Sequence, residues 1–381
     1  MKKILKRHLQ IDLPSNRSAF LWGPRKTGKS FWISKHYQGF PLIDLLKTDV
    51  FADYISRPSL LREQFQTYKG LIIIDEIQMV PDLLNEIHWL IENAGISFLM
   101  TGSSARKLRR GHANLLGGRA WRFSMMPLTY FETQGFNLEK IVISGLIPPH
   151  FLSDYPIQDI RSYVADYLKE EIASEAIIQN IPAFSEFLRI AALTTGELLN
   201  YTNVGRETGV KAKTIRNYFQ ILEDTLLGFR LQAWKKKKNR RLIETEKFYL
   251  FDVGLTNYLS RRKPSMGTPE FGKSFEHFIF MELKAFQAYS NPELEIHYWR
   301  TASGYEVDFI LDDMNVAIEV KSSSKIHSGH TKGLKALLEE HTVNKAIIVS
   351  TIKQEMTVSK GIHVLPWKQF LEMLWQGKFD S

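Results

Sequence analysis

Short apolar runs alternate with helical periodicity over the first hundred residues of the chain. Apolar side chains fill most positions of four segments, at 19–22, 41–45, 71–74 and 96–102. Continuous apolar runs are typical of parallel strands that are buried on both faces. Between them, apolar residues recur at helical spacing in 60–65, with Ser59 as the expected cap, and in 81–93. Strands that alternate with helices in this way predict a parallel α/β sheet with helices on both faces.

Helical patterns dominate the middle of the chain. Helices are expected at 163–180 and 183–192, followed by short helices at 197–200, 204–210 and 211–222. Gly209 permits a sharp turn before a helix whose apolar residues face inward, as in a helix-turn-helix. These apolar residues are Ile215, Phe219 and Leu222. Two strands expected at 229–234 and 247–251 form a hairpin behind it, so this region is predicted to be a helical lid with a winged helix.

The polar segment 261–269 contains two prolines and a glycine and has the composition of a linker. A helix is expected after it at 271–289. Strands are expected at 296–300, 306–311, 316–321, 346–350 and 362–365. Because 381 residues exceed one ordinary hydrophobic core, we predict three domains, at 1–150, 151–260 and 261–381.

A glycine-containing motif follows the first predicted strand. It consists of Gly23, Pro24, Arg25, Lys26, Thr27, Gly28, Lys29 and Ser30. The spacing G-x-x-x-x-G-K-S is that of a phosphate-binding P-loop. Its glycines let successive backbone N–H groups turn toward an anion, and the helix that follows adds its positive dipole end. Lys29 would lie between the β- and γ-phosphates of a nucleotide, and the Ser30 hydroxyl would bind Mg²⁺.

Two carboxylates end the predicted strand 71–74. Ligands of open α/β sheets collect at the carboxyl ends of the strands, so Asp75 is expected to face the metal. Glu76 would orient or deprotonate the attacking water. At the end of the next strand, Thr101, Ser103 and Ser104 can hydrogen-bond the γ-phosphate or that water. We favour Ser103 or Ser104 and assign Ser103, although these residues can equally cap the following helix.

Arginine and lysine are frequent in the next segment. Its cations are Arg106, Lys107, Arg109, Arg110, Arg119 and Arg122. One of them can stabilise charge on the transferring phosphoryl group, and we favour Arg119, which follows two glycines. The others are expected on the solvated surface or in contact with nucleic acid.

Four of these segments together resemble a bacterial and archaeal family of AAA-type ATPases. They are 20–30, 74–78, 99–106 and 116–119, and the similarity continues through Pro127 and Leu128 along the whole chain. Members of this family carry a C-terminal nuclease-like domain of unknown function. The resemblance implies ATP rather than GTP, a core that forms homo-oligomers, and an arginine supplied by a neighbouring subunit.

Charged residues gather on two neighbouring strands of the predicted C-terminal domain. Asp308 lies on one strand, and Glu319 and Lys321 share a face of the next. Asp308 and Glu319 can hold Mg²⁺ or Mn²⁺, which lowers the pKa of a bound water, while Lys321 positions that water or offsets phosphate charge. The pattern D…E-x-K resembles the core of restriction-endonuclease-like (PD-(D/E)xK) nucleases, which add a Glu from the preceding helix. Glu276 is the matching residue, with Glu282 as the second choice.

The D…E-x-K pattern is also common in half-buried hairpins. Nuclease folds can keep their carboxylates for binding or structure after they have lost activity. Cleavage by the predicted C-terminal domain therefore stays open at this point.

Positive charge points to a polyanionic partner. Segment 235–241 holds six cations in seven residues, and on the tip of a wing it would track a phosphate backbone without reading sequence. The predicted helix-turn-helix adds Lys211, Lys213, Thr214, Arg216 and Asn217. The net charge of +9 agrees with contact to DNA, including branched or single-stranded forms. A lid or protein contact with a merely basic surface is the alternative.

Cysteine is absent, which excludes a disulfide framework and a thiolate metal site and indicates a reducing cytoplasm. Residues 1 to about 18 are predicted to form an amphipathic helix and a turn at 14–16, without the apolar core of a signal peptide. No apolar run approaches membrane-spanning length, so no membrane partner is expected.

Two functions follow from these patterns. The first is a cytoplasmic, DNA-directed ATPase with Mg²⁺-dependent nuclease capacity. The second is a nucleotide-gated switch in regulation or defence, whose C-terminal domain binds nucleic acid without cutting it.

Overall fold

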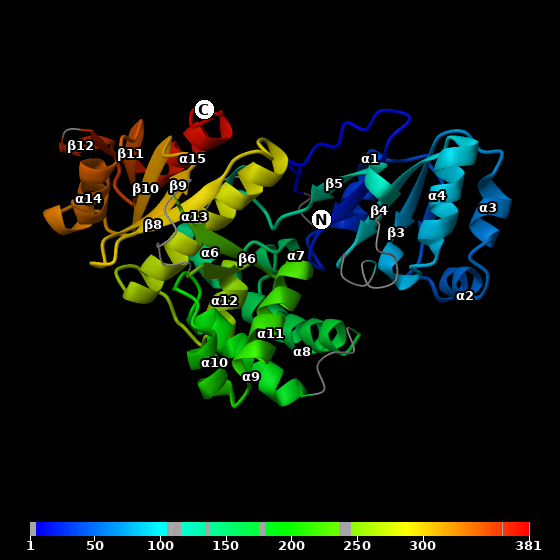
Figure 1. Ribbon diagram of the computed structural model, residues 1–381, viewed down its shortest axis with the longest axis horizontal. Helices are drawn as coiled ribbons and strands as arrows, with labels where there is room; N and C mark the ends of the chain where they lie inside the picture. The colour runs from blue at the N-terminus through cyan, green and yellow to red at the C-terminus, as the bar shows by residue number, and fades with distance from the viewer. Residues whose placement is uncertain are drawn as a thin grey trace. The chain divides into compact units, whose positions relative to one another are not determined.

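The computed structural model describes residues 5–104, 108, 116–133, 137–174, 180–235, 245–359 and 361–380. Contacts divide the chain into two compact units. We call Ile4–Leu128 with Ile221–Leu227 the P-loop unit, and Thr129–Gln220 with Gly228–Ser381 the C-terminal unit. The contacts do not follow the predicted boundaries at 150 and 260, because residues on both sides of position 260 belong to one unit (Figure 1).

The P-loop unit contains a parallel sheet of five strands in the order β2-β3-β4-β1-β5. The strands are β1 (Ser18–Trp22), β2 (Leu42–Asp44), β3 (Leu71–Asp75), β4 (Ser97–Gly102) and β5 (Ala120–Ser124). The four strands predicted from apolar runs are confirmed. The sequence pattern missed β5, whose residues are exposed or only partly buried, as suits the edge of a sheet.

Among the described residues of this unit, four α-helices accompany the sheet. They are α1 (Lys29–His36), α2 (Thr48–Ser56), α3 (Leu60–Phe65) and α4 (Leu83–Ala94). The predicted helices at 60–65 and 81–93 are thus confirmed to within two residues, whereas α2 was not predicted. Ser59 precedes α3, but its hydroxyl donates to the Glu63 side chain instead of capping the backbone.

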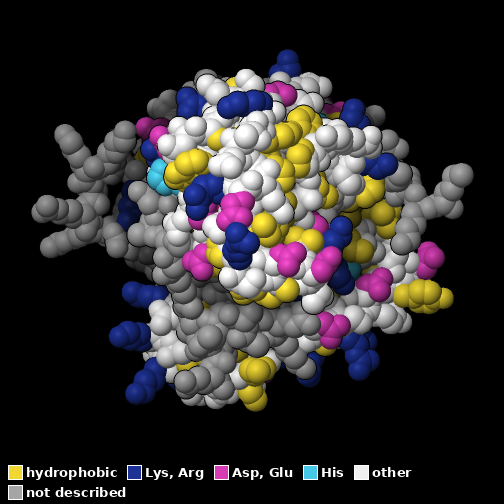
Figure 2. Space-filling view, turned by 90° about the vertical axis from the view of Figure 1, so that its right-hand side faces the viewer, with side chains coloured by type: hydrophobic (Ala, Val, Ile, Leu, Met, Phe, Trp, Pro, Cys, Tyr) yellow, Lys and Arg dark blue, Asp and Glu magenta, His cyan; other side chains and the backbone are white. Residues whose placement is uncertain are grey.

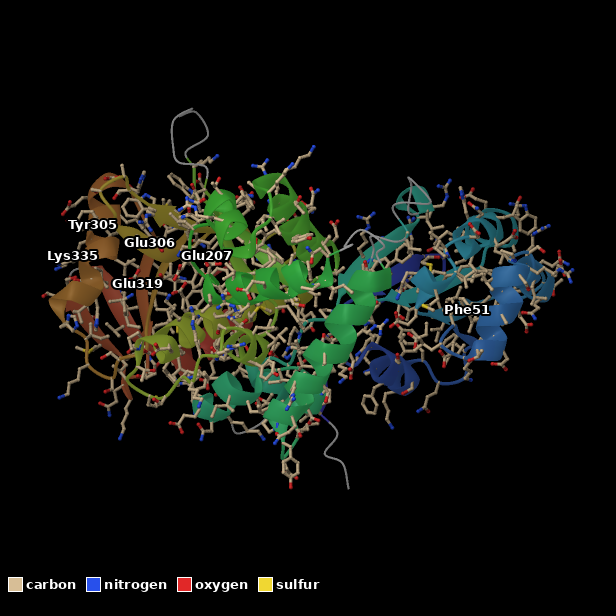
Figure 3. All side chains as sticks on the ribbon, turned by 90° about the horizontal axis from the view of Figure 1, so that it is seen from below. Phe51, Glu207, Tyr305, Glu306, Glu319 and Lys335 are labelled. Atoms are coloured by element: carbon tan, nitrogen blue, oxygen red, sulfur yellow. The ribbon has the colours of Figure 1, made fainter. Side chains whose placement is uncertain are left out.

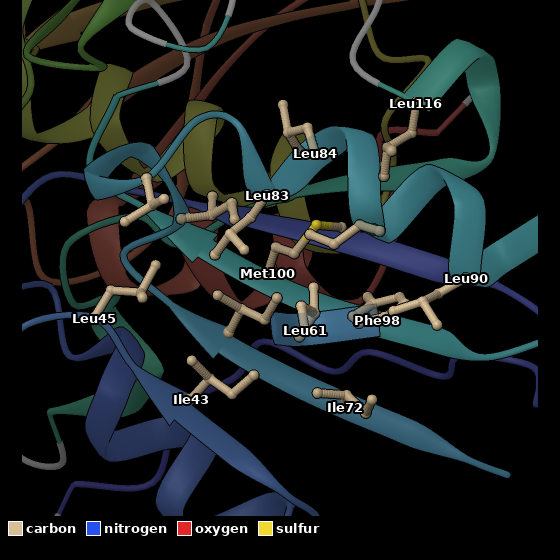
Figure 4. Close-up of a cluster of buried hydrophobic side chains, with 14 of the residues drawn as sticks. Ile43, Leu45, Leu61, Ile72, Leu83, Leu84, Leu90, Phe98, Met100 and Leu116 are labelled. Carbon is tan, nitrogen blue, oxygen red and sulfur yellow. The ribbon is translucent and has the colours of Figure 1, made fainter. Parts of the chain in front are cut away.

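Both faces of the sheet are buried, as the apolar runs predicted. On β3, Ile72 and Ile74 belong to a core cluster that α4 covers, and Ile73, which points to the other face, is also buried. Figure 4 shows this cluster, in which Leu83 and Leu90 of α4 pack over the strand residues. Burying each such side chain stabilises the unit by about 1.5–3 kcal/mol.

The predicted N-terminal helix is wrong: residues 5–13 contain no helix. Arg7, Leu9 and Ile11 are buried and the residues between them are exposed, which is the two-residue period of an extended chain. The apolar residues of this segment fit that period as well as a helical one. The predicted turn is confirmed, since the Arg17 N–H donates to the Pro14 carbonyl at 3.0 Å.

The C-terminal unit is built on a mixed sheet of eight strands in the order β12-β13-β11-β10-β9-β8-β6-β7. The strands are β6 (Gly228–Ala233), β7 (Lys247–Leu250), β8 (Ile296–Arg300), β9 (Glu306–Leu311), β10 (Val316–Lys321), β11 (Lys345–Ser350), β12 (Met356–Ser359) and β13 (Ile362–Pro366). Every strand predicted beyond residue 228 is confirmed, and only the exposed edge strand β12 was missed among the described residues.

The helices from residue 138 onward lie on this sheet and beside it (Figure 1). They are α6 (Leu138–Ser144), α7 (Pro148–Phe151), α8 (Pro156–Ser174), α9 (Ile181–Leu193), α10 (Tyr201–Thr208), α11 (Ala212–Asp224), α12 (Val253–Leu259), α13 (Pro269–Tyr289), α14 (Lys332–Glu340) and α15 (Trp367–Trp375). The 3₁₀ turns are η1 (Ile77–Met79), η2 (Leu116–Gly118), η3 (Tyr130–Glu132) and η4 (Ser328–Thr331). The predicted helix at 197–200 is wrong, because Leu198 forms a β-bridge with Lys247.

The helix-turn-helix pattern is present as α10, a turn and α11. Gly209 ends α10 in the left-handed conformation, with φ 69°, and the three apolar residues predicted to face inward are buried. The hairpin of β6 and β7 follows, and β6 also pairs with β8 in parallel. The predicted wing is therefore part of the C-terminal sheet, which explains why the middle of the chain does not form a unit of its own.

Over the ranges that the structure describes, we find no helix with both the length and the apolar character needed to cross a membrane.

Candidate functional site

The P-loop connects β1 to α1 in a tight, hydrogen-bonded turn. The Gly23 N–H donates to the Gly102 carbonyl of β4 at 3.2 Å, and the Thr27 hydroxyl donates to the Pro24 carbonyl at 2.8 Å. A Cβ on Gly23 would lie 2.6 Å from the Met125 carbonyl oxygen, so only glycine fits there. Gly28 has φ 99°, which other residues rarely adopt.

Lys29 is the first residue of α1, and its side chain is buried inside the loop. Its ammonium donates to the Gly23 carbonyl at 2.6 Å and to the Pro24 carbonyl at 3.2 Å. Ser30 and Lys26 are exposed, and Arg25 is half-buried. The loop therefore carries one enclosed positive charge at the positive end of a helix, which is the arrangement that the motif predicts for phosphate binding.

The strand order brings Asp75 and the polar residues that end β4 to the same end of the sheet as the P-loop. β4 lies between β1 and β3, and all three run parallel, with Trp22 level with Gly102 and Ile74 level with Met100. Their carboxyl ends therefore coincide. At a spacing of about 4.8 Å between strands, Asp75 lies roughly 10 Å from the start of the P-loop.

Thr101 holds both acidic residues at the end of β3, Asp75 by its carboxylate and Glu76 by its backbone N–H. Its hydroxyl donates to the Asp75 carboxylate and accepts from the Glu76 N–H at 3.0 Å. Glu76 has φ 59° and ψ 50°, a left-handed conformation that is uncommon outside glycine. Of the three polar residues considered at the end of β4, Thr101 is thus the one that holds Asp75.

Gln78, to which the sequence reasoning assigned no role, completes this network. Its amide nitrogen donates to the Glu76 carboxylate and to the Ser103 hydroxyl, the latter at 3.0 Å. Gln78 is the middle residue of η1, only two positions after Glu76. The signal available in the sequence was a polar residue inside an otherwise apolar 3₁₀ turn, next to the acidic pair.

Arg7 is a second residue that was missed. Its guanidinium is buried and donates to the Thr27 carbonyl of the P-loop and to the Met126 carbonyl at 2.6 Å, beyond β5. A buried guanidinium among backbone carbonyls fixes the loop to the end of the neighbouring strand. The helical interpretation of the N-terminal segment assigned Arg7 no contact with the P-loop.

Arg119 lies beside the amino ends of the strands, whereas the P-loop follows a carboxyl end, on the opposite side of the sheet. It precedes Ala120, which is level with Ser18, the first residue of β1, whereas the P-loop follows the last residue of that strand. The five residues of β1 separate the two edges by about 16 Å at 3.3 Å per residue. The Arg119 guanidinium forms an exposed ion pair with Glu92. Arg119 is therefore too far from the P-loop of its own chain to act there, and its role at the site of a neighbouring subunit stays a prediction.

The other cations of that segment divide into two groups. Arg122 is exposed on β5. Arg106, Lys107, Arg109 and Arg110, and most of the helix expected after Ser104, lie outside the described residues.

A second cluster of charged residues lies in the C-terminal unit. The structure brings together the four predicted residues, Glu276 of α13, Asp308 of β9, and Glu319 and Lys321 of β10. The Asp308 carboxylate accepts from the Val320 N–H at 2.7 Å, and the Lys321 ammonium lies 2.5 Å from a Glu319 oxygen. Asp308 thereby bonds the backbone of β10 where the regular pairing of the two strands has ended.

Two further residues of this cluster come from β7 and were missed. The Tyr249 hydroxyl donates to Glu276 at 2.6 Å, and the buried Lys247 ammonium is paired with Glu306 of β9. Figure 3 labels Glu306 and Glu319 on this sheet. Since Lys247 and Tyr249 precede the predicted linker, the cluster is not contained in 261–381.

Burial shifts the protonation of the cluster. It raises the pKa of Glu276 to about 7 and that of Glu319 to about 8, and the neighbouring Asp308 charge adds to both shifts. Burial alone would lower the pKa of Lys321, but Asp308 and Glu319 raise it above its ordinary value. Near neutral pH the carboxyl groups of the cluster are therefore partly protonated, and its lysine ammonium groups offset the remaining negative charge.

Asp308 and Glu319 stay a predicted metal pair. Within the described ranges, no three His, Asp or Glu side chains are grouped so that they could hold a metal ion. Glu282, the second choice on α13, lies apart from the cluster and accepts from the Tyr130 N–H at 2.7 Å and the Trp375 indole N–H at 3.0 Å.

The outer face of the helix-turn-helix is polar and open. Lys211, Lys213, Arg216 and Asn217 are exposed and Thr214 is half-buried. Residues around the start of α11, with Asn200 and Thr202 of the preceding segment, line a depression of about 500 Å³. Of the basic segment 235–241, only Lys235 lies within the described residues. Figure 2 shows another face of the molecule, on which basic and acidic side chains are interspersed.

Comparison with known families gives one description for the first part of the chain. Residues 15–134 are similar to an AAA domain. Together with the P-loop, this similarity supports an AAA-type P-loop ATPase. Residues 136–266 match a domain of unknown function (DUF8612), and residues 271–370 match another (DUF4143). The last match names no activity, so the restriction-endonuclease-like resemblance stays a prediction.

Relatives extend over nearly the whole chain. An uncharacterized protein of Mycobacterium tuberculosis is 24% identical over 362 residues, which cover 92% of this chain and 80% of that protein. An uncharacterized protein of Methanocaldococcus jannaschii is 23% identical over 408 residues, covering 95% of this chain and 89% of its own.

Two solved structures show weaker likeness. The ORC2 protein of Aeropyrum pernix, in its ADP form, has a TM-score of 0.30 at 12% identity, covering 64% of this chain and 88% of its own. Can2 from Sulfobacillus thermosulfidooxidans, in complex with cyclic tetra-adenylate, has a TM-score of 0.22 at 8% identity, covering 96% of this chain and 98% of its own.

Proposed function

We propose that this protein hydrolyses ATP at the P-loop and uses the reaction to change its hold on DNA. One observation carries the ATPase assignment. The enclosed Lys29 ammonium and the Asp75–Glu76 pair lie at the carboxyl ends of strands in one sheet, and Thr101 of β4, the strand between β1 and β3, bonds Asp75. The similarity of residues 15–134 to an AAA domain supports it independently.

Each residue at that edge has a role that its chemistry suits. Lys29 and the loop N–H groups bind the β- and γ-phosphates. The Ser30 hydroxyl and the Asp75 carboxylate offer the oxygen ligands that Mg²⁺ prefers, and the bound ion supplies positive charge to the phosphates. Glu76 orients the attacking water, and Ser103 contacts the γ-phosphate.

Substitution of Lys29 tests the ATPase proposal. Lys29→Ala removes the enclosed charge, so we expect ATP turnover to fall at least about 100-fold, in line with losses from removing a transition-state contact. Lys35→Ala is the matched control, because Lys35 is exposed on the same helix. Turnover should be measured with and without duplex, single-stranded and branched DNA. Undiminished turnover by Lys29→Ala would exclude the P-loop as the site.

For the C-terminal cluster we propose binding of nucleic acid, with Asp308 and Glu319 as ligands of Mg²⁺ or Mn²⁺ and Lys321 beside the attacked phosphate. Glu276 completes the predicted set. Cleavage would make the protein a DNA-directed ATPase with nuclease capacity.

A non-cutting switch is the second candidate, and the charge balance of the cluster favours it. Lys321 is already paired with Glu319, Lys247 with Glu306, and Asp308 with a backbone N–H. Incubation of linear, single-stranded and branched DNA with Mn²⁺ distinguishes the two. Products that disappear in Asp308→Ala favour the nuclease, and intact DNA with every form favours the switch.

A further inference from the structure

We propose that Gln78 is a positioning residue that couples Ser103 to Glu76, so that contact of a terminal phosphate with Ser103 sets the direction of the Glu76 carboxylate. This inference rests on the proposed ATPase function and adds a regulatory contact to that same site.

The first support is that one amide group joins both residues. The Gln78 nitrogen donates to Glu76 and to Ser103, so both of its N–H bonds are used in the site. Gln78 is 4% exposed, and neither contact is open to exchange with bulk water. The orientation of the amide is set by chemistry, because the opposite orientation would place its oxygen against a carboxylate.

The second support is the other end of the amide. The Gln78 oxygen is buried and has no hydrogen-bond partner among the described residues. It lies over Gly102, where a Cβ would come within 2.6 Å of it. A buried acceptor without a donor destabilises a fold, and an apolar side chain of the same length would avoid this. The two N–H contacts are therefore what the amide contributes at this position.

The third support is the backbone of Glu76. Its left-handed conformation is held at the N–H by Thr101, while its carboxylate is held by Gln78. The direction of the carboxylate thus depends on two anchors, one of which also bonds Ser103. A phosphate oxygen that accepts from the Ser103 hydroxyl changes the position of that hydroxyl. The Gln78 amide, which bonds the hydroxyl, then moves with it and changes the direction of the Glu76 carboxylate.

Kinetics of Gln78→Met separate positioning from binding. Methionine keeps the length of the side chain and removes both donors and the unpartnered oxygen. We expect kcat to fall about 10- to 100-fold, which is less than the roughly 100- to 10,000-fold contribution of a general base, because Glu76 itself remains. The Kd for ATP, measured by titration with a fluorescent ATP analogue, should stay within about threefold, because Lys29 and the loop are unchanged. The midpoint of thermal unfolding should stay within about 4 °C of the wild type.

A double-mutant cycle tests the coupling itself. Ser103→Ala should lower kcat, and Gln78→Met with Ser103→Ala should lower it no further than the more severe single change, because both act through one contact. Gln66→Ala, at an exposed position after α3, is the control for loss of an amide. Gln78→Ala serves as a second variant if the methionine chain does not pack.

The outcomes are distinct. Wild-type protein that neither binds nor hydrolyses ATP would overturn the proposed function. Active wild-type protein whose Gln78 variants keep kcat within twofold would overturn the positioning role alone. If the fall in kcat of the double variant equals the product of the falls in the two single variants, the coupling between Gln78 and Ser103 is overturned.

Discussion

At the residue scale, Glu282 shows how a carboxyl group can be buried for structure instead of metal binding. Its side chain is almost fully buried on α13 and accepts N–H bonds from Tyr130 of η3 and Trp375 of α15. Burial raises its pKa to about 8, against the opposing effect of these two donors. The folded chain therefore binds a proton at Glu282 that the unfolded chain loses near pH 4.5.

This raised pKa predicts a loss of stability with rising pH. The contribution of Glu282 to folding is complete below about pH 4.5 and is lost as pH rises through about 8, since the folded state binds more protons. We expect Glu282→Gln to reduce the fall in unfolding midpoint between pH 5 and pH 8.5.

Thermal unfolding across that pH range measures the effect. Glu293→Gln is the control, because Glu293 is exposed in the same unit. Equal pH dependence in wild type and Glu282→Gln would contradict the assignment of this proton to Glu282.

Residues were predictable from sequence where their partners are local. Lys29 contacts Gly23 and Pro24 within its own loop, so a spacing rule is enough to find it. Gln78 and Ser103 are 25 positions apart, and Lys247 and Glu306 are 59 apart. Such pairs are made by strand order, which a one-dimensional pattern does not contain.

At the element scale, the residues of helix α11 that are predicted to contact DNA lie on one face of the helix. Ile215, Phe219 and Leu222 are buried, and the exposed cations lie on the other side of the helix. Arg216 also packs over the ring of Tyr201, at 5.1 Å from its centroid, which limits the freedom of that guanidinium. An ordered cation on an open helix face suits contact with phosphates.

Removal of two charges from this face gives the element's prediction. The double variant Lys213→Ala with Arg216→Ala should weaken DNA binding and lower the slope of log K against log salt by about 2, one for each lost phosphate contact. Fluorescence anisotropy with labelled duplex DNA at several salt concentrations measures this slope.

A matched pair of charges controls for net charge. Lys332 and Lys335 are exposed on α14, and Figure 3 labels Lys335 there. Their replacement by alanine removes the same charge from another surface. If both double variants change the slope equally, the α11 face has no special role in DNA contact.

Elements were predictable where one periodicity was unambiguous. The apolar runs of β1, β3 and β4 fit a doubly covered strand, and α4 fits a helix with one apolar face. Edge strands β5 and β12 lack that signal because solvent reaches them. The N-terminal segment fits periods of 2 and 3.6, and only its buried contacts decide between them.

At the scale of the whole molecule, sheet pairing overrides the order of segments in the chain. The hairpin predicted as a wing supplies Lys247 and Tyr249 to the C-terminal cluster through the pairing of β6 with β8. The Pro- and Gly-containing segment near residue 265 looks like a linker by composition, yet the residues on both sides of it belong to one unit. Composition describes a segment but does not show which strands it joins.

Arg119 bears on assembly. Because it lies at the edge of the sheet opposite the P-loop, it can serve a phosphate only in another copy of the chain. A head-to-tail assembly would bring this edge of one subunit to the P-loop edge of the next, and such heterologous contacts close into rings when the rotation permits. We therefore propose a homo-oligomer in which Arg119 acts on the neighbouring site.

Mixing of two inactive variants tests this arrangement. Lys29→Ala and Arg119→Ala should each turn over little ATP alone, since one lacks the phosphate ligand and the other the stabilising charge. In mixed assemblies, an Arg119→Ala subunit beside a Lys29→Ala subunit regains an intact site between them. With equal amounts and random mixing, about a quarter of the wild-type rate is expected in a closed ring. Arg122→Ala, an exposed arginine of β5, should stay active. Full activity of Arg119→Ala, or mixtures that never exceed the sum of their parts, would exclude a contribution of Arg119 across subunits.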